Sequence, residues 1–304
     1  MTDDADAIVF PTPYEPIRQR LAARRIFEGE AVARLTQADR AQVRVMVVSG
    51  GQPLGPAEMD AYPNLGRIVA IGAGFDGVDT QAAAARGIQV VSGAGANAED
   101  VADWAAGALI AAARGFFPND AKVRAGAWVW GDFKPVRSLS AMTVGIVGLG
   151  HIGRAVGRRL EPFRCRLAWQ GPRPKADAPY PYISDLRELA RLSDALVLAA
   201  PLDAATAGMV DAAVLEALGP AGILVNVGRG GLVDEEALIA ALKSGGLAAA
   251  ALDVFAQEPT PAQRWSDVPN VILSPHTAAV THEALGAVFD LAARNVTDFL
   301  DAPR

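Results

Sequence analysis

The sequence has little cysteine and histidine, and it lacks both basic runs and long apolar runs. One cysteine, Cys165, and three histidines in 304 residues exclude an internal disulfide and offer no set of ligands with zinc-site spacing. A net charge of −6 without a basic cluster argues against nucleic-acid and membrane partners. No apolar segment is long enough to span a bilayer, and the acidic start, Met1-Thr-Asp-Asp, is unlike a secretory signal. We therefore expect a cytoplasmic protein that acts on a small molecule without a metal.

The middle of the chain carries a glycine motif in the setting of a dinucleotide site. An apolar run at residues 142–147 leads into Gly148-Leu149-Gly150-His151-Ile152-Gly153, and a helical pattern follows. The first glycine permits a tight turn, the second lets the main chain approach a pyrophosphate, and the third lets the helix pack closely on the strand. The helix N-terminus then offers N–H groups to the phosphates. We predict that all six motif residues line a cofactor site.

Strand and helix patterns alternate on both sides of this motif, and a hydrophobic content of 51% suffices for two cores. The first half predicts a smaller, flavodoxin-like α/β domain, and the second half predicts a Rossmann-type doubly wound parallel sheet. We expect one domain from residues 1–97 and 281–304 and another from residues 98–280. The expected strands are 43–48, 67–71, 88–91, 166–169, 195–199, 223–227, 248–252 and 271–273. The expected helices are 80–86, 98–114, 185–192, 211–218, 234–243 and 281–300.

Three charged or titratable residues follow three separate strands of the second sheet: Arg229, Glu258 and His276. Reduction of a 2-oxo acid needs a cation for the carboxylate and carbonyl, and a proton donor for the developing alkoxide. A carboxylate beside an imidazole stabilises the protonated ring, so Glu258 and His276 suit the donor role together. Spacing alone is equally consistent with a core histidine and two surface charges.

Four segments together resemble the D-isomer-specific 2-hydroxyacid dehydrogenases. The resemblance extends in order from about Ile71 to the carboxyl terminus, and it implies that Arg229 binds the substrate carboxylate and carbonyl. It also implies that His276 is the acid/base, with Glu258 as its partner. The segments are GLGHIG at 148–153, LVNVGRGGLVDEEAL at 224–238, ALDVFAQEP at 251–259 and SPHTA at 274–278.

The same resemblance assigns further residues to the substrate and the cofactor. Gly72-Ala-Gly-Phe-Asp-Gly-Val-Asp79 is similar to the family's carboxylate-binding loop, with Ala73 and Gly74 at the binding positions, which makes the first domain the substrate-binding one. Asp253 is expected on the nicotinamide side. Three further expected cofactor contacts lie near strand ends: Pro201, Thr206 and Val227. The others follow the second strand of the nucleotide domain: Gln170, Gly171, Arg173 and Lys175. The arm with Trp128 and Trp130 is expected to close over substrate, to contact a partner subunit in a homodimer, or to pack in a core or interface.

The residues after the second strand of the nucleotide domain bear on the choice of cofactor. NAD enzymes place a carboxylate here for the ribose hydroxyls, and this chain has Gln170-Gly171-Pro172-Arg173-Pro174-Lys175 instead. Arg173 and Lys175 suit a 2′-phosphate, so we expect NADPH to be preferred, with NADH possible. The segment is similar to the basic loop of glyoxylate/hydroxypyruvate and hydroxyphenylpyruvate reductases, although Gly171 and Pro172 replace the usual serine and arginine. Ordinary solvated charges are the alternative interpretation.

The expected function is the reduction of glyoxylate or hydroxypyruvate by NADPH in a homodimer. Two alternatives remain open from the sequence. One is an NAD-dependent dehydrogenase of another 2-hydroxy acid, such as phosphoglycerate or phenyllactate. The other is a dinucleotide-sensing scaffold like the family's corepressors, which keep the same three residues. The sequence leaves the physiological substrate and the direction of the reaction undetermined.

Overall fold

The computed structural model describes residues 6–132 and 135–303 and divides the chain into two compact units. One unit comprises Met1–Asn97 and Val280–Arg304, and the other comprises Ala98–Ala279. Each unit is a parallel sheet with flanking helices, which confirms the predicted α/β class. No helix among the described residues has the length and apolar character needed to cross a membrane.

The sheet of the first unit has five parallel strands in the order β2-β1-β3-β4-β5, the flavodoxin order. Its central strands are largely buried on both faces, which is why their sequences are mostly apolar. The strands are β1 (Ala7–Phe10), β2 (Arg25–Glu28), β3 (Val43–Ser49), β4 (Arg67–Ile71) and β5 (Gln89–Ser92). The short helices are α1 (Glu15–Arg20), α2 (Glu30–Ala33), α3 (Gln37–Gln42), α4 (Pro56–Asp60) and α5 (Thr80–Ala85).

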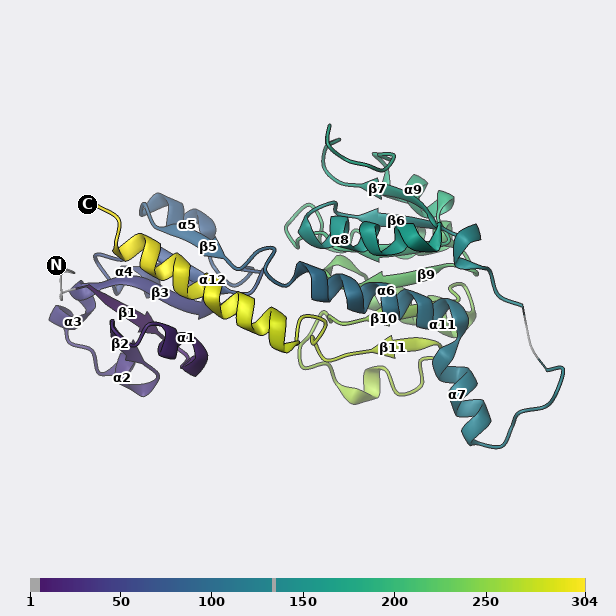
Figure 1. Cartoon of the computed structure of the whole chain (residues 1–304), viewed down its shortest axis with the longest axis horizontal. Helices are drawn as coiled ribbons and strands as arrows, with labels where there is room; N and C mark the ends of the chain where they lie inside the picture. Colours follow the sequence, from purple (N-terminus) through teal and green to yellow (C-terminus); the bar gives the residue numbers. More distant parts are fainter. Residues whose placement is uncertain (1–5, 133–134, 304) are drawn as a thin grey trace. The chain divides into compact units, whose positions relative to one another are not determined.

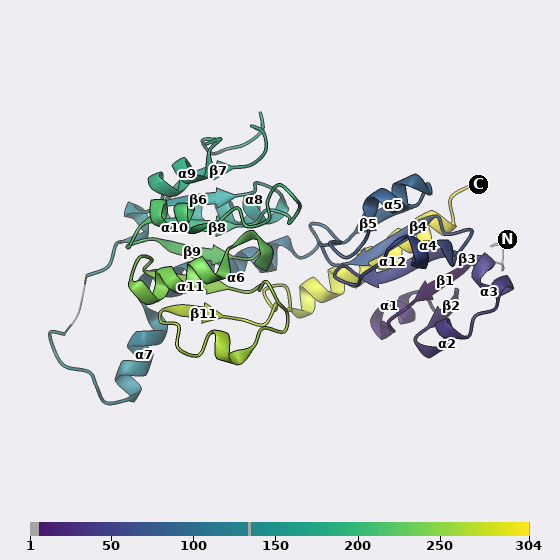
Figure 2. The ribbon, with the colours of Figure 1, turned by 180° about the vertical axis from the view of Figure 1, so that it is seen from behind.

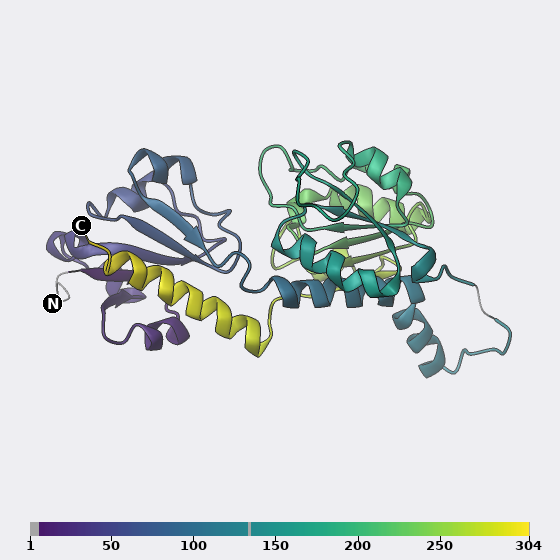
Figure 3. The ribbon, with the colours of Figure 1, turned by 45° about the horizontal axis from the view of Figure 1, so that its top comes forward.

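The last helix of the chain, α12 (His282–Leu300), completes the first unit. Its N-cap is Thr281, whose hydroxyl accepts a hydrogen bond from Ala284 N–H at 3.0 Å. Its buried residues Ala292, Ala293 and Val296 join the core on one face of the sheet, and Figure 3 shows the helix in yellow along that sheet. The carboxyl-terminal segment is therefore part of the same compact unit as the amino-terminal one.

The sheet of the second unit has six parallel strands in the order β11-β10-β9-β8-β6-β7. The strands are β6 (Thr143–Val147), β7 (Arg166–Gln170), β8 (Ala195–Leu198), β9 (Ile223–Asn226), β10 (Ala249–Leu252) and β11 (Val271–Leu273). Beyond β7, an isolated parallel bridge joins Trp169 to Tyr182, with Trp169 N–H donating to Pro181 O at 2.9 Å. We number the strands of this sheet along the chain from β6 as strand 1 and count the bridge at Tyr182 as a shortened strand 3. Their order across the sheet is then 3-2-1-4-5-6, the Rossmann order, followed by one further strand, β11.

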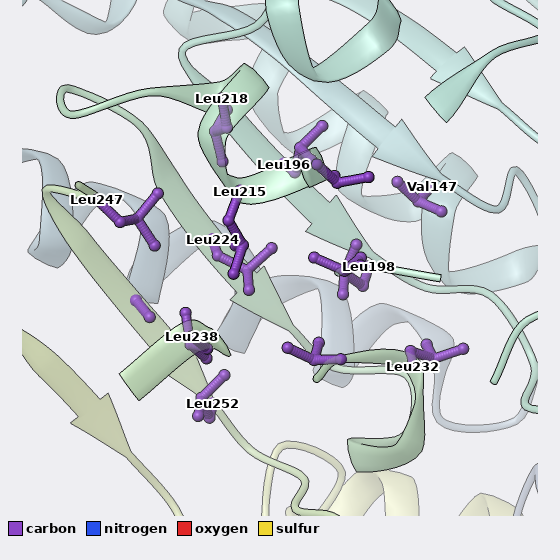
Figure 4. Close-up of a cluster of buried hydrophobic side chains, with 14 of the residues drawn as sticks. Val147, Leu196, Leu198, Leu215, Leu218, Leu224, Leu232, Leu238, Leu247 and Leu252 are labelled. Atoms are coloured by element: carbon purple, nitrogen blue, oxygen red, sulfur yellow. The ribbon is translucent and has the colours of Figure 1, made fainter. Parts of the chain in front are cut away.

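Helices cover both faces of the second sheet. Figure 1 shows α6 (Ala98–Arg114) and α8 (His151–Leu160) on one face. Figure 2 shows α9 (Leu186–Leu192), α10 (Ala212–Leu218) and α11 (Glu235–Ser244) on the other. The core under the second group of helices is dominated by leucine, as Figure 4 shows: Leu196, Leu198, Leu215, Leu218, Leu224, Leu232, Leu238, Leu247 and Leu252. Packing on both faces fixes the sheet, so the loops at its edge have a rigid base.

Several described elements are absent from those expected above: β1, β2 and α1–α4 in the first unit, and α7 in the second. After α6 the chain forms α7 (Phe116–Arg124), in which Phe116, Phe117 and Val123 are all exposed. Its apolar residues do not form a stripe that packs on the chain itself, so periodicity gave no signal. Four short 3₁₀ segments complete the described elements: η1 (Leu139–Ala141), η2 (Glu161–Phe163), η3 (Gly230–Leu232) and η4 (Ala262–Arg264).

Candidate active site

The glycine turn between β6 and α8 has the geometry that a dinucleotide requires. Gly148 has a φ of +89°, and a Cβ atom on Gly153 would lie 2.0 Å from the Gly148 carbonyl oxygen. Gly150 faces open space, since a Cβ atom there would have nothing within 4 Å, and as N-cap of α8 it leaves the first helical N–H groups without a side-chain cap. His151 is exposed at the first helical position. The turn therefore suits close approach of a pyrophosphate.

Three of the other expected cofactor residues follow strands of the same sheet. Pro201 is exposed after β8, and Val227 is buried directly after β9. The Thr206 hydroxyl donates to Pro201 O and accepts from Asp203 N–H, both at 2.8 Å. It therefore braces the turn after β8, and its contact with a cofactor stays a prediction.

The basic loop after β7 lies beside the glycine turn. Lys175 Nζ donates to the carbonyl oxygen of Leu149 at 2.8 Å, and it lies 6.0 Å from the centre of the Trp169 ring. Arg173 is exposed. This loop also contains an acid, Asp177, which lies further along than the expected carboxylate position, and Arg154 of α8 pairs with it at 2.9 Å. The loop thus places a lysine ammonium against the predicted phosphate site, and its one carboxylate has a cationic partner.

Arg229 lies at the end of β9 in a turn that is held by a buried asparagine. Asn226, 1% exposed, donates from Nδ2 to Arg229 O at 2.9 Å and accepts from Gly228 N–H at 3.1 Å. Arg229 Nη1 donates to Gly228 O at 2.7 Å. The role of Asn226 was not predicted, since nothing in a strand pattern shows that a polar side chain turns back onto the next loop.

The structure brings Glu258 and His276 together. Glu258 Oε2 lies 2.7 Å from His276 Nδ1, and Glu258 Oε1 accepts from Phe255 N–H at 3.0 Å. The two side chains are 37% and 50% exposed, so both are open to a reacting molecule. The contact with Glu258 fixes Nδ1 as the inner nitrogen of the His276 ring, which leaves Nε2 on the opposite side.

Asp253 holds the turn that carries His276. His276 has a φ of +55°, a conformation that a non-glycine residue adopts only with support. Asp253 O accepts from His276 N–H at 2.8 Å, and the Asp253 carboxylate, 2% exposed, accepts from Ser274 Oγ at 2.5 Å and Thr277 N–H at 2.8 Å. The residue that the resemblance places on the nicotinamide side therefore also positions the histidine.

The predicted carboxylate-binding loop follows β4 in the first unit. Gly72 has a φ of +84°, and a Cβ atom on Gly50 would lie 1.8 Å from Gly74 O, so two glycine turns pack main chain against main chain. Within the described part of the chain, no hydrogen bond engages the N–H groups of Ala73 and Gly74. These two groups can therefore bind an anion such as a carboxylate.

Taken together, the glycine turn, the arginine and the Glu–His pair at the carboxyl edge of one Rossmann sheet define an oxidoreductase that uses a nicotinamide dinucleotide. The family model described as "D-isomer specific 2-hydroxyacid dehydrogenase, NAD binding domain" matches residues 106–278. The chain belongs to the D-isomer-specific 2-hydroxyacid dehydrogenase family.

Relatives and solved structures agree with this membership. A glyoxylate/hydroxypyruvate reductase of Arabidopsis thaliana is 39% identical over 84% of this chain and 80% of its own length. A hydroxyphenylpyruvate reductase of Plectranthus scutellarioides is 39% identical over 78% of this chain and 76% of its own. The crystal structure of an NADPH-dependent glyoxylate/hydroxypyruvate reductase of Sinorhizobium meliloti with NADP and malonate is 37% identical, with a TM-score of 0.86 over 97% of this chain and 93% of that one.

Proposed function

We propose that the protein reduces a small 2-oxo acid to the D-2-hydroxy acid with NADPH, and that glyoxylate and hydroxypyruvate are its leading substrates. The observation that carries this proposal is the 2.7 Å contact between His276 Nδ1 and Glu258 Oε2 on the same sheet edge as Arg229. The substrate class is supported by relatives named as glyoxylate/hydroxypyruvate reductases.

Different residues of the chain bind the substrate and donate the proton. When bound, NADPH supplies the hydride that reaches the carbonyl carbon. Arg229 binds the substrate carboxylate and carbonyl oxygen. The N–H groups of Ala73 and Gly74 in the first unit remain predicted carboxylate-binding groups. His276, protonated and held at Nδ1 by Glu258, gives the Nε2 proton to the carbonyl oxygen as negative charge develops there. Glu258 then faces a neutral ring, which recovers a proton from solvent.

The basic loop supports NADPH over NADH. No carboxylate stands at the end of β7, Arg173 is exposed, and Lys175 donates to Leu149 O at 2.8 Å within the glycine turn. A 2′-phosphate at this place gains two cations, whereas a 2′-hydroxyl of NADH finds no carboxylate acceptor at the strand end. The Sinorhizobium structure with NADP supports the same choice.

We further propose that the protein is a homodimer in which the segment around α7 contacts the partner subunit. Its large apolar residues are more than half exposed: Phe116, Phe117, Val123, Trp128, Val129, Trp130 and Val136. Among them Trp130 reaches 89% exposure. Several large apolar side chains exposed within one segment favour a protein interaction site there.

Replacement of the histidine tests the proposed chemistry. His276→Ala should lower kcat for glyoxylate reduction by about 100-fold or more, since general acid catalysis contributes roughly that much. NADPH binding, followed by quenching of tryptophan fluorescence, should be retained. The matched control is His282→Ala, an exposed histidine at the start of α12, which should have wild-type kcat. Wild-type turnover in His276→Ala, or loss of NADPH binding as its main defect, would contradict the proposal.

A further inference from the structure

The turn that carries Glu258 is held by two carboxylates, and only one of them is Glu258. Phe255 N–H donates to Glu258 Oε1 at 3.0 Å. The next amide along the chain, Ala256 N–H, donates to Glu235 Oε1 at 2.6 Å. These two amides belong to planar peptide groups that are joined at the Phe255 Cα. A hydrogen bond that anchors Ala256 N–H therefore restricts the two backbone dihedrals of Phe255, which set the direction of Phe255 N–H towards Glu258.

Glu235 is a buried carboxylate with a full set of partners. It is the first residue of α11, its side chain is 6% exposed, and its Oε2 lies 2.7 Å from Arg264 Nε. Hydrogen bonds from the Arg264 guanidinium to Glu236 and Glu235 raise the pKa of Arg264, so that its charge persists. Burying a carboxylate is costly unless such partners compensate it. The neighbouring Glu236 also puts a negative charge at the start of α11 and pairs with Arg264, but its side chain is 77% exposed. Burial of Glu235 therefore needs a reason beyond the helix terminus.

The main chain next to Arg229 packs on the same turn. A Cβ atom on Gly230 would lie 1.8 Å from the Phe255 carbonyl carbon and 2.2 Å from Ala256 N. On the other side, the Phe255 ring packs against Trp265 at 5.9 Å between ring centres. The turn at residues 255–258 is thus fixed against the Arg229 turn, against the segment of Arg264 and Trp265, and against α11 through Glu235.

We propose that Glu235 is a positioning residue for the acid–base pair. It holds Ala256, and through Phe255 it holds the Glu258 carboxylate where Oε2 meets His276 Nδ1 at 2.7 Å. This inference rests on the proposed function, in which His276 is the proton donor. Glu235 contacts neither His276 nor the substrate-binding arginine, and it acts only through Glu258.

Three single variants test the proposal with glyoxylate and NADPH. Glu235→Ala should lower kcat about tenfold or more, because small displacements of catalytic groups cost rates of this order, while the KM for NADPH changes by less than about twofold. Glu235→Gln keeps an oxygen for Ala256 N–H and should retain more activity than Glu235→Ala. Glu236→Ala is the matched control, since it removes the exposed partner of Arg264, and it should have wild-type kcat. Thermal unfolding is recorded for each variant so that all are assayed while folded.

A double-mutant cycle with Glu258→Gln separates positioning from a general structural role. Adding Glu235→Ala to Glu258→Gln should cost less than about twofold further, because the carboxylate that Glu235 positions is already gone. A full additional loss, an unchanged kcat in Glu235→Ala, or an equal loss in Glu236→Ala would overturn the inference. An unchanged kcat in Glu258→Gln alone would instead overturn the proposed acid–base pair, and the inference with it.

Discussion

At the scale of single residues, the proposed preference for NADPH rests on Arg173. It is exposed in the loop after β7, where a 2′-phosphate is expected. Arg173→Ala should raise the KM for NADPH about tenfold, the scale of one lost charge-assisted contact, and leave the KM for NADH unchanged. Arg187→Ala, an exposed arginine on α9, serves as the control in the same initial-rate assay. Equal effects on both cofactors would show that Arg173 is only a solvated charge.

Arg229 is predicted to bind the 2-oxo acid and not the cofactor. Its guanidinium can bind a carboxylate and a carbonyl oxygen through a planar fork, which a lysine ammonium cannot reproduce. Arg229→Lys should therefore raise the KM for glyoxylate about tenfold or more and lower kcat, with the KM for NADPH little changed. Initial rates over a range of both substrates measure these constants. A selective rise in the KM for NADPH would contradict this role and show that Arg229 contributes to cofactor binding instead.

The sequence pointed to the residues that we propose as reacting groups, but not to the residues that hold them in place. Arg229, Glu258 and His276 each follow a strand and suit a step of hydride transfer, and the resemblance to the family's motifs then implied their roles. Glu235 and Asn226 were not visible, since a glutamate at a helix start and an asparagine at a strand end look ordinary in a sequence. Their roles depend on which distant or local amide the side chain reaches, and only coordinates show that.

At the scale of elements, the strand–turn–helix of the nucleotide site depends on close packing at Gly153. A Cβ atom there would meet Gly148 O at 2.0 Å, whereas one on Gly107 of α6 would have nothing within 4 Å. Gly153→Ala should lose about 1–3 kcal/mol of stability and bind NADPH weakly, because α8 must move away from β6. Gly107→Ala should be neutral or stabilising by up to about 1 kcal/mol. Chemical denaturation and NADPH titration of both variants test this; equal behaviour would contradict it.

The ion pairs between α6 and α8 should make the stability of the fold depend on pH. Arg159 Nε lies 2.5 Å from Asp103 Oδ1, and Arg159 Nη1 lies 2.6 Å from Glu99 Oε2. Hydrogen bonds to Arg159 lower the pKa of both carboxyl groups. A carboxyl group whose pKa is lower in the folded state stabilises the fold above its unfolded pKa of about 4, and this stabilisation is lost as the pH falls through the folded value.

Arg159→Met should therefore be less stable than the wild type at neutral pH, and the difference should shrink as the pH falls below about 4. Both carboxylates are mostly exposed, so solvent screening limits the contribution of the pairs to about 1 kcal/mol or less. Thermal unfolding of both proteins from about pH 7 to about pH 3 measures the difference. A difference that stays constant over this range would show that packing, and not charge, accounts for it.

Elements with a strong pattern were predicted from the sequence, and weak ones were not. The helix over 98–114 and the strand over 271–273 coincide with α6 and β11. The third strand of the Rossmann sheet was absent from the prediction because prolines in this segment cannot donate main-chain hydrogen bonds to a neighbouring strand. Only the bridge at Tyr182 forms there. The prolines are Pro172, Pro174, Pro179 and Pro181. The helix α7 was missed because its apolar residues face solvent.

At the scale of the whole molecule, the exposed segment around α7 predicts the oligomeric state. Trp128 and Trp130 are 64% and 89% exposed, with ring centres 6.4 Å apart. Replacing both by serine should weaken self-association, since buried aromatic residues dominate protein interfaces. Sedimentation of wild type and double variant over a range of concentrations tests this: the wild type should be a dimer, and the variant should dissociate at higher concentration. A monomeric wild type would contradict the proposed homodimer.

The central claim is an NADPH-dependent reduction of a small 2-oxo acid, and the initial rate of cofactor oxidation by the purified protein tests it most directly. NADPH and NADH are each assayed with glyoxylate, hydroxypyruvate, hydroxyphenylpyruvate and pyruvate. We expect the highest kcat/KM with NADPH and either glyoxylate or hydroxypyruvate. Preference for NADH would contradict the role proposed for Arg173 and Lys175, and no turnover with either cofactor would contradict the claim itself.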